Sequence, residues 1–203
     1  MDRQTKVTGV ILAGGLARRM NRQDKGLILF KHRPLVSYAI EAMTAVANRT
    51  VINANRNIGS YREFGLPVIS DQSDSFDGPL AGILSAMHYA ESGIVLAMPC
   101  DSPFFNADHL TKLLESLTMH DVEVATAFDG ERLHPVFLAL NVELSSNLED
   151  YLQRGQRKVE NWIHQQKVVF TDYSKEPDIF ININSIDELS ELETKNPWQT
   201  GVF

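Results

Sequence analysis

Residues 7–25 read VTGVILAGGLARRMNRQDK, a largely apolar run followed by two glycines and a loop that carries Arg18, Arg19, Arg22 and Lys25. The run from Val7 to Ala13 does not alternate between apolar and polar residues, which is typical of a strand buried on both faces of a parallel sheet. Parallel strands need crossover connections, usually helices. This stretch therefore predicts an α/β fold.

The next hundred residues repeat the alternation of strand and helix. Apolar strands are predicted at 51–54, 66–69 and 94–98. Helices are predicted from Pro34 and from Pro79, because proline favours the first helical turn, and a third around 110–117. We expect a doubly wound, mostly parallel sheet with helices on both faces, in the manner of Rossmann-like folds.

The second half has weaker signals. Strands are predicted at 122–128 and 136–140, helices at 144–152 and 159–165, and a late strand over Ile179–Asn184. Ser185 and Glu188 form a capping-box pattern that predicts a last helix. We expect one domain over 1–203, with a first half at 1–120, a second half at 121–195 and a tail at 196–203.

Composition excludes several classes of function. The chain has 203 residues and a net charge of −7, so it lacks the basic balance of a protein that binds nucleic-acid backbones. Its one cysteine, Cys100, excludes an internal disulfide and is expected to be a small buried residue. No stretch has the length of a membrane span, and we expect a cytoplasmic protein.

Small, acidic or amide residues follow the ends of the predicted strands. Ligands of α/β sheets bind beyond these carboxyl ends. Polar turn formers are also common there, so each position alone is ambiguous. The residues concerned are Gly14, Gly15, Asn53, Asp71, Asp101 and Asn182.

The loop after the first strand has the chemistry of a phosphate site. Glycines let backbone N–H groups turn toward a phosphate, and Arg19 and Lys25 could pair with its charge. The loop is neither a Walker A motif nor G-x-G-x-x-G. A solvated basic loop remains the alternative.

Residues 12–25, LAGGLARRMNRQDK, resemble the signature LAGGxxxRMGxDK of the molybdenum cofactor guanylyltransferases, the MobA family of nucleotidyltransferases. One position departs from it, since Asn21 replaces a glycine, although asparagine tolerates left-handed backbone better than most residues. The resemblance continues through VINANR, DGPLAGILSAM, PCDSPF, LHPVF, GQRKV and NININS.

The resemblance implies a role for each matching residue. Arg19, Lys25 and Asp101 would be catalytic, and Asp101 would hold Mg²⁺. The nucleotide would contact Leu12, Ala13, Gly14, Gly15, Lys25, Asn53, Asp71, Gly78, Gly82 and Asp101. The second substrate, a pterin with a terminal phosphate, would contact His134, Arg157, Lys158, Asn182 and Asn184.

Residue chemistry is compatible with these roles but allows simpler ones. A carboxylate at Asp101 suits Mg²⁺, which takes one or two carboxylates plus phosphates, or it could cap a turn. Asn53 and Asp71 match the donors and carbonyl of guanine, whereas adenine and cytosine lack a ring N–H there, yet both residues are also common turn formers. Gly78 and Gly82 open a helix whose N–H groups could approach a ligand. His134 could be a turn residue, and Arg157 and Lys158 could lie on a solvent-exposed surface.

The implied reaction is transfer of GMP from GTP to molybdopterin, releasing pyrophosphate and forming the guanine dinucleotide cofactor. One alternative is a cytidylyl- or sugar-nucleotidyltransferase of the same fold, although LAGG rather than LAAG disfavours it. Another is a non-catalytic GTP-binding cofactor chaperone. We expect a monomer, and the family implies molybdoenzymes and an accessory GTP-binding protein as partners.

Overall fold

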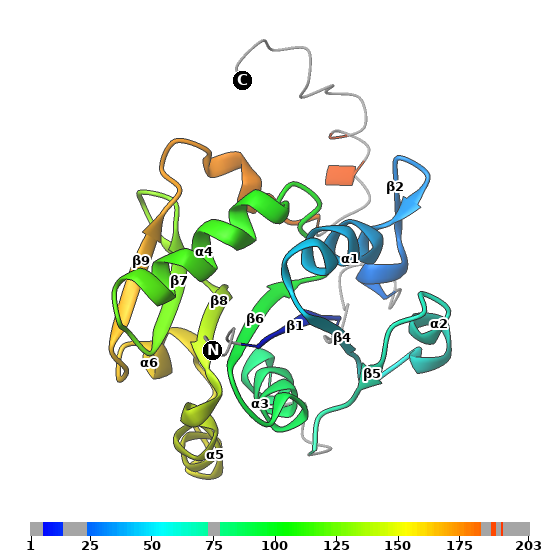
Figure 1. Cartoon of the computed structure of the whole chain (residues 1–203). Coiled ribbons are helices and arrows are strands. Elements are labelled where there is room, and N and C mark those ends of the chain that lie inside the picture. Colours follow the sequence, from blue (N-terminus) through cyan, green and yellow to red (C-terminus); the bar gives the residue numbers. More distant parts are fainter. Residues whose placement is uncertain (1–5, 14–23, 73–77, 184–187, 190–191, 193–203) are drawn as a thin grey trace, which may run out of the picture.

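The computed structural model describes residues 6–13, 24–72, 78–183, 188–189 and 192. Their centre is one seven-stranded sheet with the order β5-β4-β1-β6-β8-β7-β9 (Figure 1). The strands are β1 (Val7–Leu12), β4 (Arg49–Asn53), β5 (Val68–Ile69), β6 (Ile94–Pro99), β7 (Val124–Phe128), β8 (Leu133–Asn141) and β9 (Val168–Asp172). Only β8 runs antiparallel to its neighbours, so the predicted mostly parallel sheet is confirmed.

Helices cover both faces of the sheet. The helices α1 (Leu35–Val46) and α4 (Ala107–Met119) lie above it in Figure 1. The other face is covered by α3 (Pro79–Ala90), α5 (Ser145–Gln153) and α6 (Val159–Ile163). No helix in these described ranges is long and apolar enough to cross a membrane.

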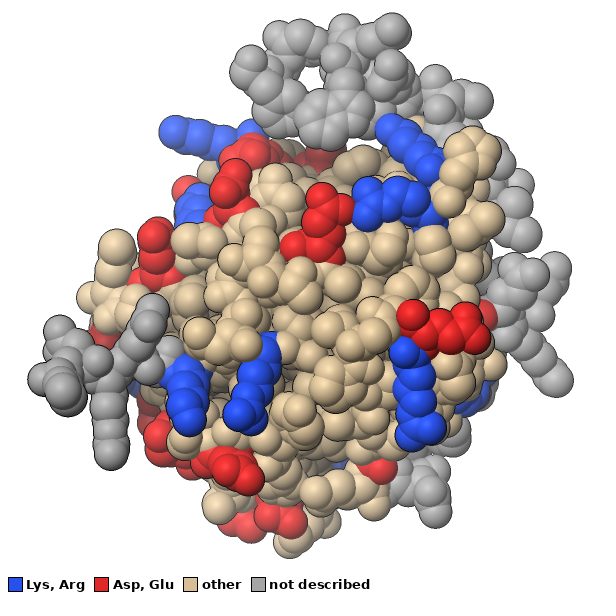
Figure 2. Space-filling view, turned by 45° about the vertical axis from the view of Figure 1, so that its right-hand side comes forward, with Lys and Arg blue, Asp and Glu red and all other residues tan. Residues whose placement is uncertain are grey.

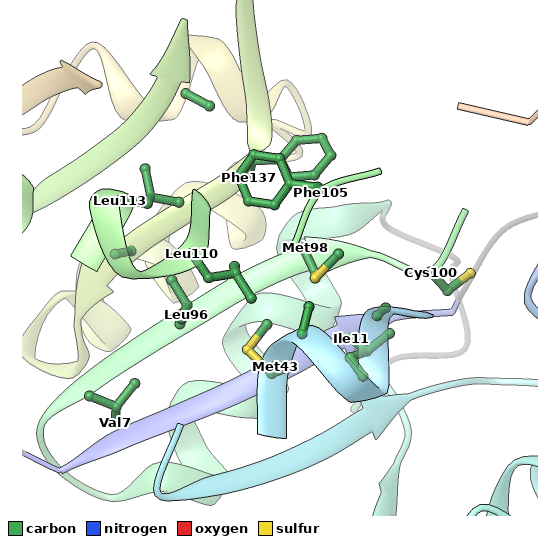
Figure 3. Close-up of a cluster of buried hydrophobic side chains, with 14 of the residues drawn as sticks. Val7, Ile11, Met43, Leu96, Met98, Cys100, Phe105, Leu110, Leu113 and Phe137 are labelled. Atoms are coloured by element: carbon green, nitrogen blue, oxygen red, sulfur yellow. The ribbon is translucent and has the colours of Figure 1, made fainter. Parts of the chain in front are cut away.

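The first strand shows why its sequence lacks polar alternation. All six residues of β1 are buried, and successive side chains enter opposite cores. Val7 and Ile11 pack under α1 and α4 with Met43 and Leu110 (Figure 3), whereas Val10 and Leu12 pack against α3 on the other face. Apolar residues on both faces follow directly from this two-sided burial.

The predicted strand at Ile179–Asn184 is wrong for its described part, 179–183. A 3₁₀ turn, η3 (Pro177–Phe180), occupies its first half, and Ile181–Ile183 continue without strand pairing. The sheet edge beside β7 is already taken by β9, which the sequence analysis missed. The segment instead crosses to the end of β6, where the N–H of Ile183 donates to the carbonyl of Asp101 at 3.2 Å.

Several small elements were also missed. They are the 3₁₀ turn η1 (Lys25–Leu27), the strands β2 (Leu29–Phe30) and β3 (Arg33–Pro34), which form a hairpin, the helix α2 (Ile58–Arg62) and the 3₁₀ turn η2 (Val142–Leu144). Of the predicted last helix, Glu188, Leu189 and Leu192 are helical, while Ser185 lies outside the described residues.

Candidate active site

Three parallel strands end together and bring distant residues to one edge of the sheet. Leu12, the last residue of β1, is the register partner of Asn53 on β4 and of Pro99 on β6. Just beyond, the Ala13 N–H donates to the Asn53 carbonyl at 2.9 Å, and the Cys100 N–H donates to the Leu12 carbonyl at 3.1 Å. Leu12 and Ala13 are thus placed by their backbones at the start of the loop. Gly14, Gly15 and Arg19 lie outside the described residues.

An ion pair stands at the end of β6. The Nζ of Lys25 lies 3.1 Å from Oδ2 of Asp101, although 76 residues separate the two in sequence. The Asp101 side chain is 12% exposed and that of Lys25 29%, so both charges face a partly enclosed space. This geometry places a cation and a carboxylate side by side where phosphates of a ligand would be met.

The neighbouring cysteine takes no part in this chemistry. Cys100 is buried, and burial, with the Asp101 carboxylate as a second cause, raises the pKa of its thiol well above the usual value. Because only the thiolate is a good nucleophile, Cys100 stays unreactive. The predicted small buried residue is confirmed.

The residues expected to contact a base form a second cluster, at the ends of β4 and β5. Nδ2 of Asn53 donates to Oδ1 of Asp71 at 2.9 Å, and Nδ2 of Asn55 donates to Oδ2 at 2.7 Å. The Asp71 N–H returns a bond to Oδ1 of Asn55 at 2.9 Å. Two amides therefore fix the plane of one carboxylate. Asn55 was missed, although its spacing of two from Asn53 was a signal for side chains on one side of an extended chain.

Gly82 brings α3 into direct contact with this cluster. A Cβ atom at Gly82 would lie 2.3 Å from Oδ1 of Asn53 and 2.9 Å from Cδ2 of Leu12. Only a glycine allows the helix to lie so close to the amide. Gly78, with φ +76°, precedes Pro79 at the first position of the same helix. The structure thus brings Asn53, Asp71 and Gly82 together, with Gly78 one turn away.

The aspartate of the signature, Asp24, is a buried carboxylate beside Lys25, and the sequence analysis gave it no role. Asp24 is 9% exposed and accepts bonds from Tyr61, Asn57 and the Gly26 N–H. A hollow of about 420 Å³ is lined by Asp24, Asn57 and residues 27–29. No sequence spacing connects residue 24 with residues 57 and 61, so only the fold could show this cluster.

His134 lies on β8 at the same edge of the sheet. Its Nε2 lies 2.6 Å from Oδ2 of Asp129, and its ring stacks on Phe180 with centroids 3.8 Å apart. Backbone N–H donation from Arg132 and the contact with His134 hold the pKa of Asp129 well below its usual range. His134 is therefore held rigidly between the β7–β8 connection and η3.

Asn182 reaches the end of β6 from the far end of the sequence. Oγ of Ser102 donates to Oδ1 of Asn182 at 2.5 Å, one residue after Asp101. The structure thus brings Asn182 to the predicted metal residue, although Asn182 is not at a strand end. Ser102, 1% exposed, was missed because serine in a Pro-rich turn carries no distinctive signal. Asn184 lies outside the described residues.

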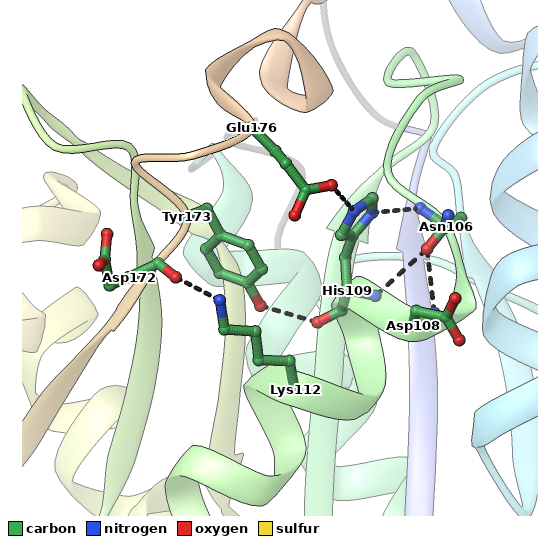
Figure 4. A network of polar contacts seen from close by, with 7 residues as sticks. All are labelled: Asn106, Asp108, His109, Lys112, Asp172, Tyr173 and Glu176. Atoms are coloured by element: carbon green, nitrogen blue, oxygen red, sulfur yellow. Dashed lines mark hydrogen bonds and ion pairs between the residues drawn. The ribbon is translucent and has the colours of Figure 1, made fainter. Parts of the chain in front are cut away.

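The segment that precedes Asn182 is hydrogen-bonded to α4. Asn106 caps α4 by accepting the N–H groups of Asp108 and His109 (Figure 4). Nε2 of His109 then reaches Glu176 at 3.4 Å, and the hydroxyl of Tyr173 donates to the His109 carbonyl at 2.7 Å. These bonds fix the chain immediately before η3 and so position Asn182.

Arg157 and Lys158 lie in the exposed connection between α5 and α6. Nη1 of Arg157 donates to the carbonyls of Leu152 and Gln156, both at 2.7 Å. These two acceptors lie in the last turn of α5 and in the connection that follows it. On the face shown in Figure 2, Lys and Arg side chains are interspersed with Asp and Glu rather than gathered in one patch.

Comparisons of the sequence with family models and with known proteins agree on one family. Residues 9–169 match the family model of the MobA-like NTP transferase domain. A molybdenum cofactor guanylyltransferase of Shewanella halifaxensis is 40% identical over 92% of this chain and 94% of its own. One from Pasteurella multocida is 43% identical over 90% of this chain and 96% of its own.

Solved structures show the same fold at lower identity. Molybdopterin-guanine dinucleotide biosynthesis protein A of Archaeoglobus fulgidus has a TM-score of 0.77 at 20% identity, covering 92% of this chain and 97% of its own. The 4-diphosphocytidyl-2C-methyl-D-erythritol synthase of Anaerococcus prevotii has a TM-score of 0.67 at 11% identity, covering 94% and 97%. The family match and the 40–43% identities confirm the resemblance found in residues 12–25: the chain belongs to the molybdenum cofactor guanylyltransferases, within the MobA-like NTP transferase family.

Proposed function

We propose that this protein transfers GMP from GTP to molybdopterin and releases pyrophosphate, with formation of molybdopterin guanine dinucleotide. The observation that carries the proposal is the placement of two carboxylates at the same edge of the sheet, just beyond the ends of β5 and β6. One, Asp101, is paired with the cation of Lys25, and the other, Asp71, is held by two amides. The first suits phosphates and the second suits a base with adjacent N–H donors.

Asp71 has the acceptor capacity that guanine requires. Each carboxylate oxygen offers about two lone-pair sites, and one on each is used by Asn53 and Asn55. The remaining sites would accept the ring N–H and the exocyclic N–H of guanine. Adenine and cytosine lack that ring N–H, so they would leave one of the remaining acceptor sites unfilled. An unfilled site on this half-buried carboxylate costs free energy that guanine would recover, and this difference favours GTP.

The reaction needs no covalent enzyme intermediate. An oxygen of the pterin phosphate attacks the α-phosphorus in line, forming a P–O bond as the bond to the β-phosphate oxygen breaks. The electron pair of that bond leaves with pyrophosphate. Lys25 would stabilise the charge that develops on the α-phosphate, and Arg19 is proposed to contact the phosphates. Positioning and electrostatics supply the catalysis, as in other phosphoryl chemistry.

Asp101 is the residue that would hold Mg²⁺. Among the described residues no group of three or more His, Cys, Asp or Glu side chains could form a complete metal site. A lone carboxylate still fits Mg²⁺, since this ion usually takes one or two carboxylates and completes its shell with water and phosphate oxygens. When bound, the ion would neutralise phosphate charge.

The two halves of the chain divide the substrates between them. Lys25, Asn53, Asp71 and Asp101 belong to 1–120, proposed as the nucleotide half. His134, Arg157, Lys158, Asn182 and Asn184 belong to 121–195, proposed as the half for the pterin. A monomeric state, a cytoplasmic location and delivery to molybdoenzymes or an accessory GTP-binding protein stay predictions.

Thermal melting tests the nucleotide preference. A ligand at 100 times its dissociation constant stabilises a protein by about 2.7 kcal/mol, which shifts the melting temperature by roughly 2–4 °C at this size. We expect this shift with GTP, enlarged by Mg²⁺, and little shift with ATP, CTP or UTP. A shift with CTP or UTP alone would contradict guanylyl transfer and favour the cytidylyl- or sugar-nucleotidyltransferase alternative.

Turnover tests the catalytic assignment. GTP labelled at the α-phosphate should yield labelled guanine dinucleotide and pyrophosphate with molybdopterin. The variant Asp101→Ala should lose this turnover and keep the fold. Asp108→Ala, which removes an exposed carboxylate at the start of α4, should remain active. Near-normal activity of Asp101→Ala would remove Asp101 from the mechanism. GTP binding by the unmodified protein without product would favour the chaperone alternative.

A further inference from the structure

Asp24 joins the turn that carries Lys25 to α2. Its Oδ1 accepts the hydroxyl of Tyr61 at 2.5 Å and the N–H of Gly26 at 3.3 Å, and its Oδ2 accepts Nδ2 of Asn57 at 3.1 Å. A carboxylate this deeply buried is stable only when such donors surround it. The bonds therefore fix the backbone on either side of Lys25.

Tyr61 and Asn57 hold this carboxylate from one side. Asn57 immediately precedes α2 and Tyr61 lies in its last turn, and the Tyr61 N–H donates to the Asn57 carbonyl at 3.1 Å. Tyr61 is fully buried, and burial raises the pKa of its hydroxyl far above the usual value. It therefore remains a hydrogen-bond donor throughout the working pH range.

The same hydroxyl lies between the Lys25 turn and the end of β6. A Cβ atom at Gly26 would lie 2.5 Å from Oη of Tyr61 and 3.2 Å from Sγ of Cys100. Gly26 is thus closely packed between Tyr61 and the residue that precedes Asp101. The distance of 3.1 Å between Lys25 and Asp101 depends on this packing, because both residues are adjacent to it in sequence.

We propose that Tyr61 is a positioning residue for guanylyl transfer, which acts through Asp24 to hold the Lys25 turn against the end of β6. The inference rests on the proposed function for its catalytic part. Tyr61 would touch neither substrate. Its hydrogen bond would set where the Lys25 ammonium stands when the α-phosphate acquires charge, so its loss would act on the transition state.

The first test is Tyr61→Phe, assayed below the melting temperature of each variant. We expect kcat to fall about tenfold, which corresponds to about 1.4 kcal/mol, with KM for GTP within twofold. Thr126→Val is the control, since it also removes a buried hydroxyl, one that donates to the Phe137 carbonyl and belongs to no proposed substrate contact. It should keep kcat. An unchanged kcat in Tyr61→Phe would overturn the proposal.

A double variant shows whether Tyr61 acts through Lys25. In a Lys25→Ala background, Tyr61→Phe should cause no further loss, because the group it positions is absent. Residues that act as one unit give such non-additive effects, whereas independent ones multiply. A further tenfold loss of kcat in the double variant would mean that Tyr61 does not act through Lys25, and it would overturn the proposal. If Tyr61→Phe fails to fold, Asp24→Asn weakens the same bonds without changing size and should give the same result.

Hydrogen exchange separates this inference from the proposed reaction. In the protein without ligands, amides of residues 24–28 should exchange faster in Tyr61→Phe and at an unchanged rate in Thr126→Val. Unchanged exchange in Tyr61→Phe would overturn the inference whatever the activity. Faster exchange together with an inactive unmodified protein would support the Tyr61–Asp24 link and reject the proposed function.

Discussion

Replacing Gly82 with alanine adds one methyl group at the contact between α3 and the cluster around Asp71. The new Cβ atom would lie 2.3 Å from Oδ1 of Asn53, whereas ordinary contact begins at 3.4 Å. The Asn53 amide must therefore retreat by about 1 Å (3.4 minus 2.3). That movement breaks its 2.9 Å bond to Asp71 and leaves the carboxylate held by Asn55 alone.

The expected loss follows from the kind of bond that is broken. A hydrogen bond to a charged group contributes about 1.5–3 kcal/mol, and about 1.4 kcal/mol corresponds to a factor of ten. We expect the affinity for GTP to fall roughly 10- to 100-fold. Alanine favours a helix over glycine by about 1 kcal/mol, so stability should change less than affinity.

Calorimetric titration with GTP and melting of the free protein measure the two effects separately. Gly59→Ala is the matched control, because Gly59 lies in α2 and a Cβ atom there would meet nothing within 4 Å. This control should bind GTP normally and be as stable as the unmodified protein or more so. GTP affinity within twofold of normal in Gly82→Ala would refute the close-packing argument.

Three further changes have defined outcomes. Lys25→Ala should lower kcat by about 10²-fold, as loss of a donor to developing charge does, and a change within twofold would make it a surface lysine. Ser102→Ala removes the bond that orients Asn182 and should raise KM for molybdopterin about tenfold while GTP binding is kept; equal effects on both substrates would contradict this role. Asp129, whose pKa is lowered in the folded state, stabilises the protein above about pH 4, and this contribution disappears as the pH falls toward its folded pKa. In Asp129→Asn, the free energy of unfolding measured with denaturant should therefore depend less steeply on pH at acidic pH. An unchanged slope would contradict this prediction.

The central sheet could be predicted because burial on two faces leaves a strong signal. The run from Val7 is largely apolar since its residues enter two cores, and Ile94–Met98 on β6 is apolar throughout for the same reason. Asn53 and Asp71 were predicted from their positions at strand ends, and parallel pairing brought them together. The local sequence pattern was sufficient to predict those residues whose position is determined by the central sheet.

The errors arose where tertiary packing overrode local pattern. IFIN at 179–182 has the isoleucine and phenylalanine content of a strand, yet Ile179 and Phe180 pack beside Phe137 and Ile183 packs with Phe30. The edge strand β9 was missed because its Phe170 is 44% exposed and its pattern is weak. No sequence signal links Asp24 with Tyr61, since their contact depends on how α2 packs against residues 24–26.

The contact between Ser102 and Asn182 has a consequence for the time at which the protein becomes competent during translation. The ribosome completes β1, β4 and β6 well before it adds residues 181–183, which close the end of β6 through Ser102 and Asp101. Chains tend to fold from the N-terminal side as they emerge. A nascent chain would thus form the Asp71 cluster while it still lacks Asn182. The proposed site for GTP would then form before the proposed site for the pterin acceptor.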